Sequence, residues 1–151
     1  MKMLTLTAML LIAAVTAPVA ATHEVPFRGS WDAVETAVVQ PPILFVDSNA
    51  TGQATHLGRY TATYDFQVNL LTGTAAGTFT MTAANGDTLF GMFTGRSSPA
   101  GSLVSIVETN IIAGGTGRFA GASGTFTVER LLDQATGVSS GSFDGAIDLD
   151  H

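Results

Sequence analysis

Four side chains of this sequence combine a reactive or charged group with a place in phase with apolar residues: Glu35, His56, Glu108 and Arg130. Residues two apart in a β-strand lie on the same face, so a charged residue in phase with apolar ones is expected to point into a buried interior. Burial raises the pKa of a carboxyl group and lets it act as a general acid, with a histidine as base or hydrogen-bond donor. His56, Glu35 and Glu108 are therefore our candidate catalytic residues.

The apolar neighbours of these four positions lie an even number of residues away. They are Tyr60 and Tyr64 for His56, Phe27 and Trp31 for Glu35, Val104 and Ile106 for Glu108, and Phe126 and Val128 for Arg130. We expect a ligand site made of polar and aromatic side chains, namely Tyr60, Tyr64, His56, Glu108, Arg130 and Trp31. The alternative is that these groups face solvent or lie at a rim, since a bulge at Gly58 would turn His56 outward.

The sequence gives little support to other kinds of catalytic or cofactor site. Cysteine is absent, which excludes thiol catalysis and cysteine-bound zinc, and the three histidines lack metal-ligand spacing. Ser97 and Ser98 are not part of a nucleophile-elbow pattern. Gly115, Gly117 and Gly121 miss the dinucleotide-binding spacing and are better explained by a tight turn. We therefore predict no metal site and no cofactor.

The first 21 residues are typical of a signal peptide, with Lys2 ahead of an apolar stretch and small residues on either side of Ala20. We expect cleavage before Thr22, a secreted or periplasmic location, and no membrane span in the mature chain. An uncleaved anchor is disfavoured because the apolar stretch is short for a span of about 20 residues. Cleavage after Ala20 would instead make His23 the third residue, an arrangement that binds Cu(II) through nitrogen atoms.

Composition favours one packed domain, which we place at residues 22–151. Apolar residues make up 46% of the sequence and charged residues 12%, so the chain has enough apolar surface to form a core. The formal net charge is −6, and the one lysine, Lys2, lies in the expected leader. Because phosphate backbones would be repelled, we expect no nucleic-acid partner.

Alternation of apolar and polar residues predicts strands along the whole chain. Every second residue of segment 59–70 is aromatic or aliphatic, and the pattern resumes after a turn at Thr72 and Gly73. Asn85 and Gly86 predict a type I′ turn into the next strand. We expect an all-β fold without helices: an antiparallel eight-stranded barrel over about residues 25–149, or alternatively a β-sandwich. The side chains expected in its interior are Trp31, Phe66, Phe79, Phe126 and Phe143.

The region from residue 89 to residue 107 is apolar on both faces of its predicted strands. Leu89 and Phe93 oppose Phe90 and Met92, and Leu103 and Val107 oppose Val104 and Ile106. One face can fill the interior, whereas the other requires a cover. We expect a homo-oligomer to bury that outer face.

Two stretches resemble a known group of barrels. Residues 58–66 (GRYTATYDF) and 106–121 (IVETNIIAGGTGRFAG) are similar to the allene oxide cyclase and dirigent barrels, the second stretch also to small secreted bacterial proteins of unassigned function. The resemblance implies a calycin-like eight-stranded barrel with an apolar lumen, often assembled as a trimer. Plant members of the group cyclise an unsaturated fatty-acid epoxide or direct phenoxy-radical coupling. No catalytic motif matches between Phe27 and Thr55, so the resemblance extends to the fold and not to the chemistry.

Three classes of function remain open. An apolar lumen favours binding of a small apolar ligand, because ligand sites are concave and mostly apolar with a few polar anchors. A cyclase or isomerase acting in the same lumen is the first alternative, although the sequence on balance favours a protein that is not an enzyme. A secreted structural or surface-interaction protein is the second, since a small barrel can be filled by its own side chains.

Overall fold

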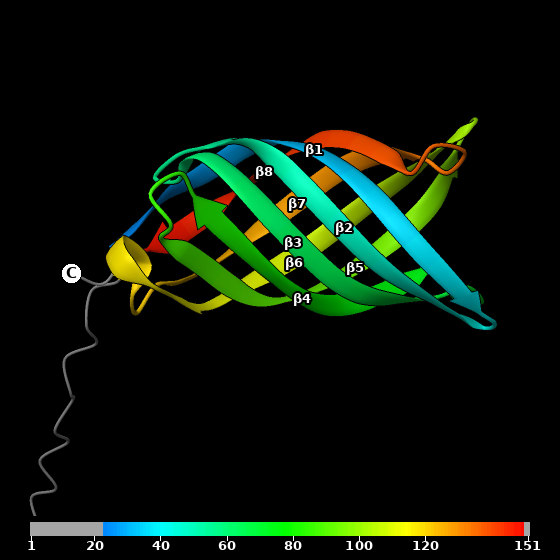
Figure 1. The fold of residues 1–151 in the computed structure, drawn as a ribbon, viewed down its shortest axis with the longest axis horizontal. Coiled ribbons are helices and arrows are strands. Elements are labelled where there is room, and N and C mark those ends of the chain that lie inside the picture. The colour runs from blue at the N-terminus through cyan, green and yellow to red at the C-terminus, as the bar shows by residue number, and fades with distance from the viewer. Residues whose placement is uncertain (1–22, 150–151) are drawn as a thin grey trace, which may run out of the picture.

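The computed structural model describes residues 23–149, which form a closed barrel (Figure 1). The expected signal peptide, and with it the alternative copper site at a cleaved amino terminus, lies outside these residues. The eight strands are β1 (Glu24–Gln40), β2 (Ile43–Ala54), β3 (Gly58–Asn69), β4 (Thr74–Ala83), β5 (Thr88–Ala100), β6 (Leu103–Gly115), β7 (Ser123–Asp133) and β8 (Val138–Asp148). One turn of 3₁₀ helix, η1 (Gly117–Phe119), stands between β6 and β7.

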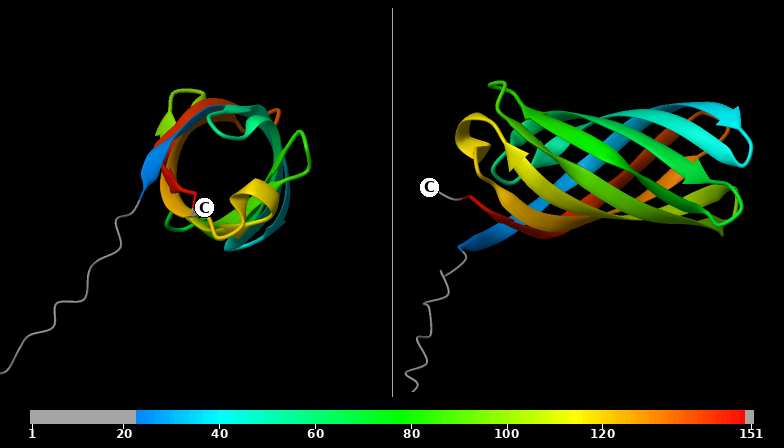
Figure 2. Two further views of the ribbon diagram at one scale, coloured as in Figure 1. Left: turned by 90° about the vertical axis from the view of Figure 1, so that its left-hand side faces the viewer. Right: turned by 90° about the horizontal axis from the view of Figure 1, so that it is seen from below.

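Each strand pairs antiparallel with the next along the chain, and β1 closes the ring by pairing with β8. Seen from the end at which η1 lies, the strands form an unbroken ring (Figure 2). The predicted antiparallel eight-stranded barrel is therefore confirmed. The alternative β-sandwich is wrong, because the pairing of β1 with β8 leaves neither strand as a free sheet edge. No helix within residues 23–149 has the length and hydropathy to cross a membrane.

The two ends of the barrel differ. One end carries the turns at residues 55–57 and 84–87 and the connection at residues 116–122, and here Leu57, Phe119 and Ala122 are buried. We call it the closed end. The other end, which we call the open end, carries the turns at residues 41–42, 70–73, 101–102 and 134–137. Side chains from the connecting segments thus cover one mouth of the barrel.

Two predictions about the connections need correction. The turn between β4 and β5 is not of type I′, which requires positive φ at both central residues. Gly86 has a φ of 93°, but His56 is the one non-glycine residue with positive φ in the described part of the chain. Asn85 instead accepts a hydrogen bond from the Asp87 amide at 3.0 Å. The segment after β6 forms η1 rather than a simple tight turn, and Gly117 there has a φ of 59°.

Aromatic side chains fill the middle of the barrel and its closed half. Phe27, Phe126 and Phe143 pack with ring centroids 5.0 to 5.2 Å apart, and Tyr64 stacks on Phe79 at 5.4 Å. The prediction of an aromatic interior is confirmed, since the five named side chains are all buried: Trp31, Phe66, Phe79, Phe126 and Phe143. Burial of such large apolar surfaces is the main source of stability for a chain without disulfides.

Candidate ligand site in the lumen

A cavity of about 250 Å³ occupies the lumen toward the open end. Its wall is mainly aliphatic, and the turn residues Leu70, Gly73 and Gln134 lie around its mouth. The apolar side chains that line the wall come from five strands: Leu44, Val46, Phe66, Val68, Ala75, Val104, Ile106 and Leu132. Inward-facing residues, which alternate with outward-facing ones along each strand, supply this wall, as the sequence pattern requires.

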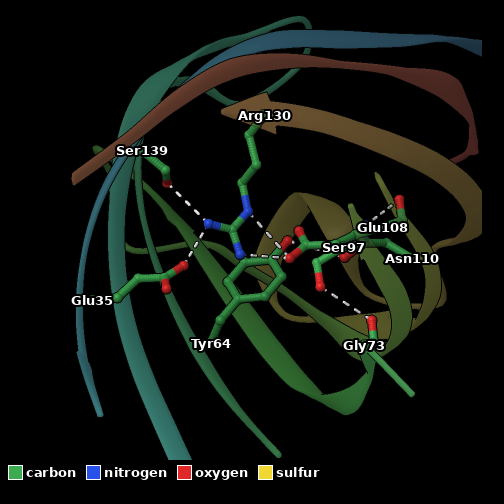
Figure 3. A network of polar contacts seen from close by, with 8 residues as sticks. All are labelled: Glu35, Tyr64, Gly73, Ser97, Glu108, Asn110, Arg130 and Ser139. Carbon is green, nitrogen blue, oxygen red and sulfur yellow. Dashed lines mark hydrogen bonds and ion pairs between the residues drawn. The ribbon is translucent and has the colours of Figure 1, made fainter. Parts of the chain in front are cut away.

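Three charged residues of the cavity lining, Glu35, Glu108 and Arg130, are joined by ion pairs (Figure 3), and we call them the floor of the cavity. Arg130 on β7 donates to Glu108 Oε1 on β6 through Nε at 3.2 Å and Nη2 at 2.8 Å. Its Nη1 donates to Glu35 Oε1 on β1 and to Ser139 Oγ on β8, the latter at 3.0 Å. Arg130 on β7 therefore joins side chains from three other strands, β1, β6 and β8.

The local backbone makes room for this ion network. Gly95 on β5 pairs with Glu108 on β6, and its Cα faces the lumen. A Cβ at position 95 would lie 3.0 Å from Glu108 Cγ, closer than nine in ten ordinary Cβ contacts. Glycine here leaves the space in which the Glu108 side chain turns toward Arg130.

Burial and charge oppose each other at Glu108. Loss of hydration raises the pKa of its carboxyl group, and Arg130 counteracts this only in part. For Arg130, burial alone would lower the pKa, but the carboxylates of Glu108 and Glu35 outweigh it and raise the pKa further. The guanidinium is therefore permanently charged, whereas Glu108 holds its proton more readily than an exposed glutamate.

Glu108 Oε2 is buried and makes no hydrogen bond among the described residues. Trp31 Nε1 and Ser48 Oγ are likewise buried without a partner there. Unpaired polar atoms in an interior cost free energy, so a ligand group or water that reached one of them would relieve that cost. Of the three residues, only Glu108 lines the cavity.

The structure brings Glu35, Glu108 and Arg130 together but leaves His56 apart. The expectation that His56 points into the lumen is wrong. It lies in the turn before β3 with a φ of 66°, and Gly58 has the same φ, so the phase of β3 does not continue back to it. The imidazole is exposed, and its Nε2 lies 3.2 Å from the Pro26 carbonyl oxygen. Among the residues that the structure describes, no acid and histidine base therefore face each other in this lumen.

The aromatic candidates are buried beside the cavity and do not form its wall. Trp31 packs edge-on against Tyr64 with ring centroids 4.9 Å apart, and neither lines the cavity. Tyr60 donates from its hydroxyl to the Ser30 carbonyl at 2.5 Å. Burial raises the pKa of both tyrosines well above the ordinary value. Their role in ligand contact stays a prediction.

Sequence reasoning missed two polar residues of the network. Asn110 is fully buried and accepts a hydrogen bond from the Tyr64 hydroxyl at 3.1 Å. Ser139 contacts the Arg130 guanidinium. The phase that identified Glu108 also applies to Asn110, two residues on, but Ser139 lies in a run of small residues without alternation. Within residues 23–149, no three potential metal ligands of the His, Cys, Asp and Glu types gather.

The fold is similar to that of a solved structure. A pterocarpan synthase dirigent protein superposes with a TM-score of 0.55 over 92% of this chain and 99% of its own, at 16% sequence identity. The fold is that of a dirigent-like barrel. No protein-family model and no curated protein matches the sequence. At 16% identity the likeness concerns the fold alone.

Proposed function

We propose that this barrel binds a small, mainly apolar molecule in the cavity at its open end. The observation that carries the proposal is the cavity of about 250 Å³, with aliphatic walls and a buried charged floor. Ligand sites are concave and mostly apolar with a few polar groups, and volumes of roughly 300–1,000 Å³ suit drug-sized ligands. The smaller volume here favours a ligand of fewer atoms.

The environment of the proposed activity is the exterior of the cell or the periplasm. The support is the amino-terminal sequence, with its apolar stretch and small residues around Ala20. Determination of the mature amino terminus by mass spectrometry tests it, and we expect the chain to start at Thr22. Recovery of the full chain with Met1 or Lys2 retained from the exporting host would contradict it.

Two neighbouring alanines on β4 provide the test of binding. Ala75 lines the cavity, whereas Ala76 is exposed on the outer wall. Ala75→Phe would fill the cavity, and Ala76→Phe would add the same side chain outside. Titration with 1-hexanol, followed by the NMR shifts of Val68, Val104 and Leu132, should reveal saturable binding to the wild type and to Ala76→Phe. Ala75→Phe should lose it.

Two results would contradict the proposal. Equal binding by Ala75→Phe and the wild type would place the ligand elsewhere. An absence of saturable shifts in the wild type across a panel of hexanol, cyclohexanol and toluene would mean that the cavity takes no small apolar molecule. Circular dichroism of both variants checks that each retains the β-sheet spectrum.

A cyclase or isomerase acting in the same lumen is the second candidate, favoured by Glu108. A buried carboxyl with a raised pKa is suited to protonate a bound substrate. The likeness in fold to a pterocarpan synthase dirigent protein also supports it. In a screen of small unsaturated epoxides, Glu108→Gln should abolish turnover without loss of ligand binding. Equal turnover in the variant would contradict this candidate.

A further inference from the structure

The floor of the cavity holds two carboxylates and one guanidinium. Glu35 and Glu108 share Arg130, and the remaining partner of the guanidinium, Ser139, is neutral. With both carboxylates ionised, the floor carries one uncompensated negative charge. Arg96, the other charged residue of the lining, belongs to the rim, where it is exposed to solvent and screened.

Arg130 has few unused N–H donors with which to bind a negatively charged ligand. A guanidinium has five N–H donors in a fixed plane. One bond comes from Nε and one from Nη2, both to Glu108, and two come from Nη1, to Glu35 and Ser139. An arriving carboxylate would compete with Glu35 and Glu108 for the same donors and would meet their repulsion.

Glu108 presents the opposite situation, because one of its oxygens is an acceptor without a donor. Oε2 is buried, belongs to a residue of the cavity floor, and makes no hydrogen bond among the described residues. A charged hydrogen-bond donor is the group that such an oxygen binds most strongly. It would also balance the charge of the floor, which a neutral hydroxyl would not.

We propose that the cavity selects small apolar amines, with the ammonium group bound to Glu108 Oε2 and the hydrocarbon tail against the aliphatic wall. The inference rests on the proposed function, since it specifies the ligand of the same site. The wall residues Val46, Val68 and Ile106 offer the tail no polar partner. The volume of about 250 Å³ accommodates a chain of roughly six carbons but not a long lipid.

Three ligands of equal chain length separate charge from apolar burial: hexylamine, 1-hexanol and hexanoate. Calorimetry or NMR titration of the wild-type protein at pH 7.5 and fixed ionic strength should give at least tenfold tighter binding of hexylamine than of hexanol. Hexanoate should bind weakest of all. This comparison uses the unaltered protein, so it does not depend on the folding of any variant.

Two glutamates provide matched variants. Glu108→Gln removes a negative charge from the floor, and Glu129→Gln removes one from the exposed outer face of β7. The first should reduce hexylamine binding at least tenfold and bring it to the level of hexanol. The second should leave the preference intact, which excludes a general attraction of amines to an acidic protein.

Other results of these titrations would contradict the preference for amines, or both that preference and the proposed function. If hexanol or hexanoate binds as tightly as hexylamine and Ala75→Phe abolishes that binding, the proposed function stands and the preference for amines is overturned. A preference for hexylamine that persists in folded Glu108→Gln also overturns it. If none of the three ligands binds, both the proposed function and this inference fail.

Discussion

Arg130 donates two hydrogen bonds to a single oxygen of Glu108, at 3.2 and 2.8 Å, and the other oxygen has no hydrogen-bond partner among residues 23–149. The same guanidinium also forms an ion pair with Glu35, so two carboxylates share one cation in the interior of the barrel. Because two carboxylates depend on one guanidinium, we expect the stability of the barrel to change on substitution of Arg130 or Glu108 and with pH.

Loss of the arginine should be the most damaging change at the floor. Arg130→Met leaves Glu35 and Glu108 without their cation, and breaking a buried pair in this way costs about 3–5 kcal/mol. Urea unfolding at pH 7 should show this loss of stability. The double variant Arg130→Met/Glu108→Leu should recover much of it, because the uncompensated buried charge is gone. Arg118→Met, at an exposed ion pair with Asp87, is the control and should cost far less.

Stability should fall as pH rises through the pKa of Glu108. The folded protein raises this pKa above its ordinary value of 4.5, so between the two values the folded state binds more protons than the unfolded state. The unfolding free energy therefore decreases with rising pH across that window. Glu108→Gln should lack this component of the decrease, as measured by urea unfolding from pH 4.5 to 8. Parallel pH profiles for the wild type and the variant would contradict the assignment.

A carboxylate pair on the outer wall should destabilise the barrel at neutral pH. Asp65 on β3 lies directly opposite Asp47 on β2, and a hydrogen bond with Asp47 is the main cause of its raised pKa. Like charges opposite each other on neighbouring strands cost roughly 0.2–1 kcal/mol. Asp65→Asn should therefore raise the melting temperature at pH 7. The gain should vanish near pH 3, where the raised pKa of Asp65 leaves its carboxyl protonated, and a gain equal at both pH values would indicate another cause.

The outer faces of β5 and β6 should mediate self-association. Met92 and Ile111 are cross-strand partners, and their side chains are 61% and 54% exposed. We expect a homo-oligomer by light scattering at micromolar concentration, with the trimer suggested by the family resemblance, and dissociation in Met92→Glu/Ile111→Lys. Val38→Glu, at an equally exposed position on β1, should leave the assembly intact. A monomeric wild type, or dissociation by Val38→Glu alone, would contradict this interface.

The sequence by itself determined the strand pattern and the direction of most interior side chains. Alternation over residues 59–70 and the phase of Phe126, Val128 and Arg130 follow from backbone geometry, which places every second side chain on the same face. For that reason Glu108, Arg130 and Glu35 could be assigned to the interior without knowledge of their partners.

Tertiary structure decided what the local pattern does not contain. His56 lies outside the lumen because a positive φ in the turn before β3 interrupts the alternation of inward and outward side chains. This φ depends on the connection between the strands and not on the alternation itself. The meeting of Glu35 with Arg130 joins residues 95 positions apart, and only closure of the ring brings β1 and β7 to the same depth. The same closure, with Leu57 and Phe119 covering one end, left the cavity at the other.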